Sequence, residues 1–203
     1  MGGYTDASSR WHLADLYDQA IDADHFENGD WSHIHDYADV LSWCLSILSD
    51  SPSAAAMLKE AMGRGWMIAL EDLSGGSYCI DVEQKLIILD NAALVPSALG
   101  RSGYFRNLTL VTLAKALRDV WQEKRHGGFD EEYKPEYIMT LERVRAADCD
   151  VMAILVGWEL RAAEHTDIWR HLIGSENGDM AMCFSGPALK KECLISSVMW
   201  GMT

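Results

Sequence analysis

The sequence predicts a single α+β domain in which helices predominate and a small antiparallel sheet lies near the middle of the chain. Three observations support this prediction. Apolar residues recur at helical spacing before about residue 62 and after about residue 107. Short apolar or alternating runs, separated by turn residues, occupy residues 66–90. No internal repeat or biased linker divides the 203 residues, so one domain is expected over residues 1–203.

The N-terminal part, about residues 10–62, is expected to form helices. Residues 11–23 and 37–48 each place apolar side chains on one face at helical spacing, with a turn at residues 25–30 between them. Ser51-Pro52-Ser53 ends the second helix, and a third helix begins near Ala54 and ends at Gly63-Arg64-Gly65.

The middle of the chain predicts a sheet followed by a central helix. Three runs, at residues 66–70, 77–82 and 85–90, are typical of short strands and are expected to form the antiparallel sheet, over about residues 66–90. From about residue 107 to 125, an apolar stripe from Leu110 to Trp121 predicts a helix. Basic residues and Gly127 then give this helix a favourable C-terminus.

The C-terminal part, about residues 139–201, is expected to be helical. A long helix from about Met139 to Ala163 precedes a helical segment at residues 168–173, and a last helix is expected after Pro187. In the long helix, apolar residues at helical spacing flank Asp148; they are Val144, Val151, Leu155 and Trp158. Because an unpaired buried carboxylate costs several kcal/mol, this stripe predicts a cation beside Asp148.

Charge and composition exclude several classes of partner. The chain has 31 acidic and 17 basic residues and a net charge of −14, which disfavours nucleic acid and anionic membrane surfaces. Its longest apolar run, residues 151–158, is too short to span a bilayer, and no secretory signal is recognisable. Five cysteines without a C-x-x-C pair are expected to be reduced and mostly buried, which is typical of a cytoplasmic protein.

Residues 113–122 read LAKALRDVWQ. This segment resembles the active-site helix of a family of bacterial zincin-like metallopeptidases, in which the helix reads approximately LAHELRHxWQ. The segments ending in Leu89-Asp90-Asn91 and spanning residues 142–150 are also similar to the family, and the resemblance covers about residues 55–175. It implies a zincin-like fold, in which a sheet precedes an active-site helix that carries H-E-x-x-H.

The chain departs from this motif at each position that carries chemistry. Lys115 replaces the first histidine, and its ammonium group has no lone pair with which to bind zinc near neutral pH. Ala116 replaces the glutamate base, and Asp119 replaces the second histidine. Ala146 stands where the family's downstream glutamate is expected, although a shift of one or two residues would make Asp148 the acid. We therefore expect no catalytic residue, metal or cofactor at these vestigial positions.

Lys115 has two interpretations. As a substitute for the metal, its nitrogen is expected within about 4 Å of Asp119 or Asp148. The simpler alternative is that Lys115 and Asp119 form an i,i+4 pair on a solvated helix face. Likewise, the acidic and histidine-rich residues 22–39 are either a solvated joint between helices or a metal site, with His35 and Asp39 able to share an ion.

Three functions remain open. The first is a catalytically inactive zincin-like domain that serves as a scaffold or binding module and accepts an extended peptide along the sheet edge. The second is a hydrolase that holds a hard metal through Asp119, Asp148 and a histidine such as His126. The third is an acidic protein-interaction module unrelated to proteolysis. The expected partner is a peptide or a protein, and the oligomeric state stays open.

Overall fold

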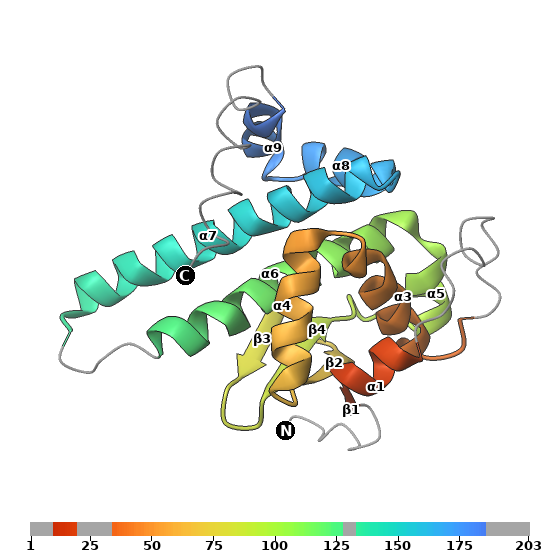
Figure 1. Cartoon of the computed structure of the whole chain (residues 1–203), viewed down its shortest axis with the longest axis horizontal. Helices are drawn as coiled ribbons and strands as arrows, with labels where there is room; N and C mark the ends of the chain where they lie inside the picture. Colours follow the sequence, from red (N-terminus) through yellow and green to blue (C-terminus); the bar gives the residue numbers. More distant parts are fainter. Residues whose placement is uncertain (1–9, 20–33, 128–132, 186–203) are drawn as a thin grey trace.

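The computed structural model describes residues 10–19, 34–127 and 133–185. Most of these residues are helical, and four short strands form one sheet (Figure 1). The strands are β1 (Arg10–His12), β2 (Met67–Glu71), β3 (Tyr78–Asp81) and β4 (Leu86–Asp90). The helices are α1 (Leu13–Asp18), α3 (Tyr37–Ser49), α4 (Pro52–Gly63), α5 (Pro96–Arg101), α6 (Gly103–His126), α7 (Pro135–Ala162), α8 (Thr166–Ile173) and α9 (Gly178–Phe184).

The sheet is mixed, so the prediction of an antiparallel sheet is wrong in part. Its strand order is β1-β2-β4-β3. The outer pairs β1–β2 and β3–β4 are antiparallel, whereas β2 and β4 are parallel. The chain passes from β2 to the edge strand β3 and returns through a hairpin to β4, which fills the centre. This arrangement gives the apolar strand β4 a buried place and leaves the more polar β3 at the edge.

The sequence also misplaced several element boundaries. Residues 10–12 form β1, where the apolar spacing predicted the start of a helix, because they pair with β2 and bring Trp11 opposite Ile68. Helix α6 begins at Gly103 rather than near residue 107, and α7 begins at Pro135 rather than near Met139. The turn at residues 25–30 and the helix after Pro187 lie outside the described residues.

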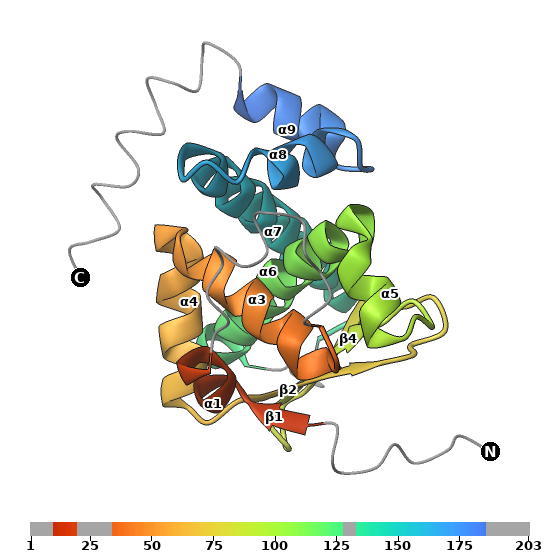
Figure 2. The same cartoon turned by 90° about the vertical axis from the view of Figure 1, so that its right-hand side faces the viewer.

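Helix α6 lies at the centre of the described structure. Its predicted apolar residues Leu110, Leu113, Ala114, Leu117 and Val120 are all buried. One side of α6 contacts α3, α4 and the sheet, and α7 packs along another side (Figure 2). The N-cap hydroxyl of Ser102 accepts a hydrogen bond from the backbone of Phe105, and Gly127 ends the helix with a positive φ of 64°, which glycine adopts readily.

Helix α7 contacts α6 through small and medium side chains. Its buried residues include Cys149, Ala153, Val156, Gly157 and Leu160. On another side, α8 comes so close that a Cβ added at Gly157 would lie 2.2 Å from Leu172 Cδ1. No helix within the described residues is long and apolar enough to cross a membrane.

Candidate functional site

The positions that the motif singles out lie where α6 and α7 pack side by side. The two helices run antiparallel, because partners of successively later residues on α6 come from earlier residues on α7. Lys115, Ala116 and Asp119 lie on α6, and Ala146 and Asp148 lie on α7. Each of these side chains therefore has its surroundings set by the contact between the two helices.

Lys115 forms an ion pair across this contact. Its Nζ lies 2.6 Å from Oδ1 of Asp150, and the two side chains are only 18% and 29% exposed. Asp150 also accepts a hydrogen bond from Asn177, which precedes α9. The expected partners, Asp119 and Asp148, are therefore wrong for Lys115. Asp150 and Asp148 are two residues apart on a helix, so they point in different directions, and only Asp150 faces Lys115.

Ala116 belongs to the hydrophobic core, since it is 0% exposed and clusters with buried residues of the neighbouring elements. A glutamate at this position would place a carboxylate among apolar side chains, where its charged form is strongly disfavoured. In this chain, position 116 thus offers neither a general base nor space for one.

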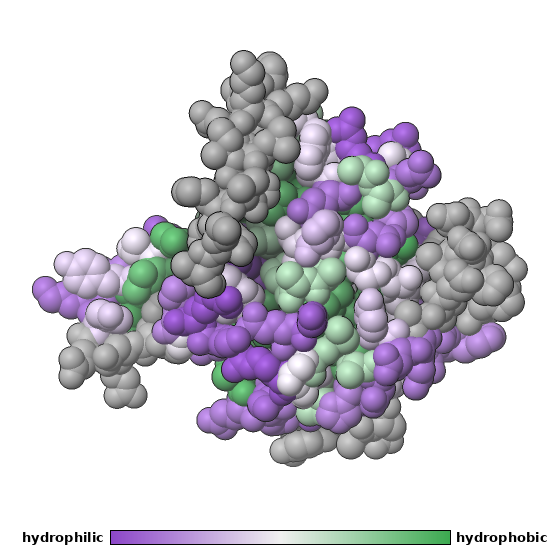
Figure 3. Space-filling view, in the orientation of Figure 1, coloured by the Kyte–Doolittle hydropathy of each residue, from purple (hydrophilic) through white to green (hydrophobic). Residues whose placement is uncertain are grey.

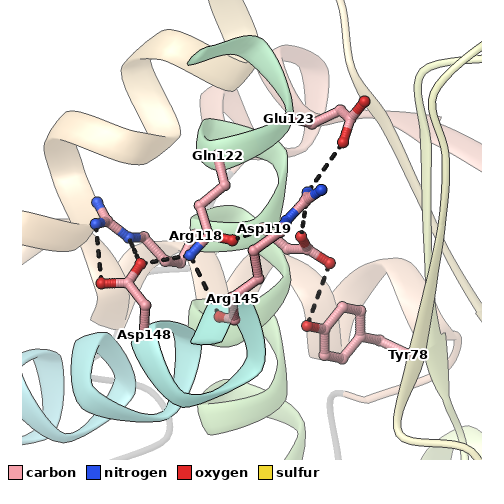
Figure 4. Close-up of polar contacts among 7 residues, drawn as sticks. All are labelled: Tyr78, Arg118, Asp119, Gln122, Glu123, Arg145 and Asp148. Carbon is pink, nitrogen blue, oxygen red and sulfur yellow. Dashed lines mark hydrogen bonds and ion pairs between the residues drawn. The ribbon is translucent and has the colours of Figure 1, made fainter. Parts of the chain in front are cut away.

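Asp119 is held by two donors from different elements. Its Oδ1 accepts a hydrogen bond from Arg145 at 3.0 Å, and its Oδ2 accepts one from the hydroxyl of Tyr78 in β3 at 3.4 Å (Figure 4). The same guanidinium of Arg145 donates to Glu123 at 2.9 Å and to Gln122 at 3.2 Å. Arg145 thus neutralises Asp119 and ties α7 to two successive turns of α6.

A pocket of about 260 Å³ opens beside this pair. It is lined by Tyr78, Asp119, Glu142, Arg145, Ala146 and Cys149. Ala146 and Asp119 therefore share one pocket. Burial raises the pKa of the Tyr78 hydroxyl above its ordinary range, with Cys149 and Asp119 adding to the effect. Burial likewise raises the pKa of the Cys149 thiol to about 12. Both groups are thus protonated near neutral pH and are poor nucleophiles.

Asp148 lies on the other side of Arg145 (Figure 4). Arg118 donates two hydrogen bonds to its carboxylate, of 2.6 and 3.1 Å, and Gln122 donates a third. Partial burial opposes ionisation, but these bonds lower the pKa of Asp148 below its ordinary value. The sequence correctly predicted a cation beside Asp148, although the cation is Arg118 rather than Lys115.

The reason given for that prediction is wrong, because the apolar stripe around Asp148 faces outward. Val144 is 60% exposed and Val151 is 44% exposed, and the Asp148 side chain is 39% exposed. The geometry also disfavours a hydrolase that would hold a metal through Asp119 and Asp148. Asp119 pairs with Arg145 and Asp148 pairs with Arg118, so each carboxylate already has its own cation.

The other candidate metal ligands have structural roles or lie outside the described residues. Asp39 accepts hydrogen bonds from the backbone of His35 and Asp36, and Asp36 caps α3 in return. His25 and His33 lie outside the described residues. Over residues 10–19, 34–127 and 133–185, no group of three or more histidine, cysteine or acidic side chains is arranged to hold a metal ion.

Comparison with known families gives one match, which covers most of the chain. The model of the family described as "Putative metallopeptidase family (DUF6782)" matches residues 18–192. The chain belongs to this family. No curated protein and no solved structure matches it.

The family's description implies a metal, and the side chains at the motif of this member do not suit one. The Lys115 ammonium offers no lone pair, Ala116 is enclosed in the core, and Asp119 is already paired. Sequence reasoning missed the partners Asp150, Arg145 and Arg118. The sequence shows that these charged residues belong to two helices. Which of them form pairs depends on how the two helices are aligned against each other.

Proposed function

We propose that this chain is a catalytically inactive member of its family and serves as a binding module. The ion pair between Lys115 and Asp150 carries this proposal, because it places a cation where the motif of a metallopeptidase would place a ligand. The burial of Ala116 supports it further, since the position of the general base is part of the core.

The edge of β3 is the surface that we propose for binding an extended peptide. In the described part of the sheet, β3 pairs only with β4, so no described strand occupies its other edge. The backbone N–H of Asp90 bonds to the carbonyl of Ser77, and the alternation of the ladder then turns the N–H groups of Tyr78 and Ile80 outward. A peptide strand gains main-chain hydrogen bonds at such an edge.

Two pockets next to this edge would select the side chains of the peptide. The pocket of about 260 Å³ and a second one of about 220 Å³ both include Tyr78, Asp119 and Arg145. The two pockets are lined by three carboxylates, those of Asp119, Glu123 and Glu142, and by one guanidinium, that of Arg145, so negative charge is in excess. This balance of charge favours a peptide with a lysine or arginine side chain.

The absence of catalysis is tested with purified protein supplemented with zinc and incubated with denatured casein. We expect no cleavage above that of a control containing a chelator. Cleavage that stops with the chelator and is lost in Asp119→Ala would overturn the proposal of inactivity.

Peptide binding is tested separately by selection from a library of ten-residue peptides displayed on phage, followed by fluorescence anisotropy with synthetic peptides. Ile80→Pro removes an outward N–H without removing a ladder bond, so we expect at least about tenfold weaker binding. Arg10→Pro, at the start of the opposite edge strand β1, is the matched control and should bind normally. Equal binding by all three proteins would exclude the β3 edge.

A further inference from the structure

The contact between α6 and α7 contains another, larger pocket, of about 500 Å³. The described residues that line it come mainly from the C-terminal end of α6 and the N-terminal half of α7, and none of them belongs to β3. It shares only Arg145 with the two pockets beside β3. Its volume is within the range of pockets that hold small molecules. It is therefore a separate candidate site.

Part of the lining of this pocket is apolar and accessible to water. Tyr133, Leu141 and Val144 line the pocket and are 52%, 40% and 60% exposed. Figure 3 shows hydrophobic surface over the N-terminal half of α7. Covering such side chains with an apolar group removes them from water, which is favourable. A ligand of this pocket is therefore expected to have an apolar body.

Trp121, which also lines the pocket, offers no free ring face. The guanidinium carbons of Arg118 and Arg125 lie 3.9 and 3.5 Å from the centre of its ring. Two guanidiniums in van der Waals contact with one ring centre cannot share a face, so they cover opposite faces. Neither face is thus left to attract a cationic ligand. The edge of an aromatic ring carries positive partial charge, which suits an anion better.

Arg118 is the cation that a ligand in this pocket would meet. Its Nε and Nη2 bind Asp148, and none of the described residues accepts a hydrogen bond from its Nη1. The other guanidinium of the lining, that of Arg145, is already bound to Asp119 and Glu123. The Arg118 side chain is only 15% exposed, so an anionic group would meet a partly desolvated guanidinium. A carboxylate forms strong, charge-assisted hydrogen bonds with such a group.

We propose that this pocket binds a small organic carboxylate, with its apolar body against Leu141 and Val144 and its charged group at Nη1 of Arg118. Asp148 repels a second anion, but hydrogen bonds from Arg118 and Gln122 already offset its charge. The inference goes beyond the proposed peptide binding. Because β3 does not line this pocket, either site can be present without the other.

Isothermal titration calorimetry with the full-length protein tests the proposal. The probes are decanoate, which has a chain, and naphthoate, which has a fused ring, each compared with its neutral amide and with an amine of the same body. We expect at least one carboxylate to bind at one site per chain, at least about tenfold more tightly than its amide and its amine. No binding of either carboxylate, or an amide or amine that binds as tightly, would overturn the proposal.

Two matched pairs of variants assign the binding to this pocket. Arg118→Gln should weaken carboxylate binding by about tenfold and leave amide binding unchanged. Its control is Arg125→Gln, because Arg125 stacks on the same ring of Trp121 but does not line the pocket.

The second pair does not depend on the folding of Arg118→Gln, since both positions are exposed. Val144→Asp should weaken carboxylate binding by about tenfold, whereas Val151→Asp, on the same helix but outside the pocket, should not. Unchanged binding in Arg118→Gln and Val144→Asp, or equal losses in each variant and its control, would exclude this pocket as the site.

Discussion

Replacing Lys115 with methionine removes the cation that joins α6 to Asp150 and keeps most of the apolar stem. Exposed ion pairs contribute about 0–1 kcal/mol, and breaking a fully buried pair costs about 3–5 kcal/mol. The Lys115 and Asp150 side chains are 18% and 29% exposed, so they lie between these limits. Asp150 also keeps its hydrogen bond from Asn177. We therefore expect Lys115→Met to lower the free energy of unfolding by about 1–2 kcal/mol.

A double-mutant cycle isolates the pair from other effects of the substitution. Lys115→Met, Asp150→Asn and the double variant are compared with the wild type by urea denaturation, and the expected coupling energy is about 1 kcal/mol. The midpoint of thermal unfolding should fall by about 3–6 °C in Lys115→Met. Arg170→Met is the matched control, because Arg170 and Asp167 form an ion pair at 2.8 Å with side chains 76% and 78% exposed. We expect at most about 0.5 kcal/mol there.

Equal losses of stability in Lys115→Met and Arg170→Met, or no coupling between Lys115 and Asp150, would mean that Lys115 is a solvated helix residue. A cost of about 4 kcal/mol or more would show instead that Asp150 is more enclosed than its exposed fraction indicates.

Three other predictions follow from the site. The pairing in the folded state lowers the pKa of Asp148, so it stabilises the fold fully at pH values above the ordinary pKa of 3.8, and this stabilisation is lost as the pH falls below that value. Asp148→Asn should therefore flatten the dependence of the unfolding midpoint on pH below about pH 5. An unchanged dependence would contradict the pairing. The triple variant Lys115→His, Ala116→Glu, Asp119→His should bind no stoichiometric zinc by atomic emission spectrometry, since position 116 is enclosed and Ala146 supplies no ligand; one zinc per chain would refute this. Native Cys149, 2% exposed and with its pKa raised to about 12, should resist iodoacetamide at pH 8 while exposed Cys79 reacts, as peptide mass spectrometry would show; similar labelling of both would disprove it.

The sequence predicted the elements that depend on local periodicity. The stripe from Leu110 to Val120 places α6 in the core because every third or fourth residue is large and apolar. Strand pairing was not predictable in the same way. Alternation identifies β2, β3 and β4 as strands but does not say which of them lie next to each other, so the central position of β4 was missed.

The apolar periodicity of α7 does not mark its buried face, for a physical reason. The large apolar residues Val144 and Val151 suggest the buried face, yet the buried residues of α7 include small ones such as Cys149 and Ala153. Small residues let two helices approach closely, and a hydrophobicity pattern gives them little weight. The partner of Lys115 was missed for a related reason, since it depends on how α7 is rotated against α6.

Two ion pairs join α6 to α7, one between Lys115 and Asp150 and one between Asp119 and Arg145, and they set the conditions under which this contact is stable. A junction held by a metal depends on the supply of that metal. A junction held by charges is complete as soon as the chain has folded, and it responds to ionic strength instead. Because both pairs are partly buried, salt screens them less than it screens surface pairs. The α6–α7 contact should therefore persist in metal-poor surroundings and loosen only gradually in concentrated salt.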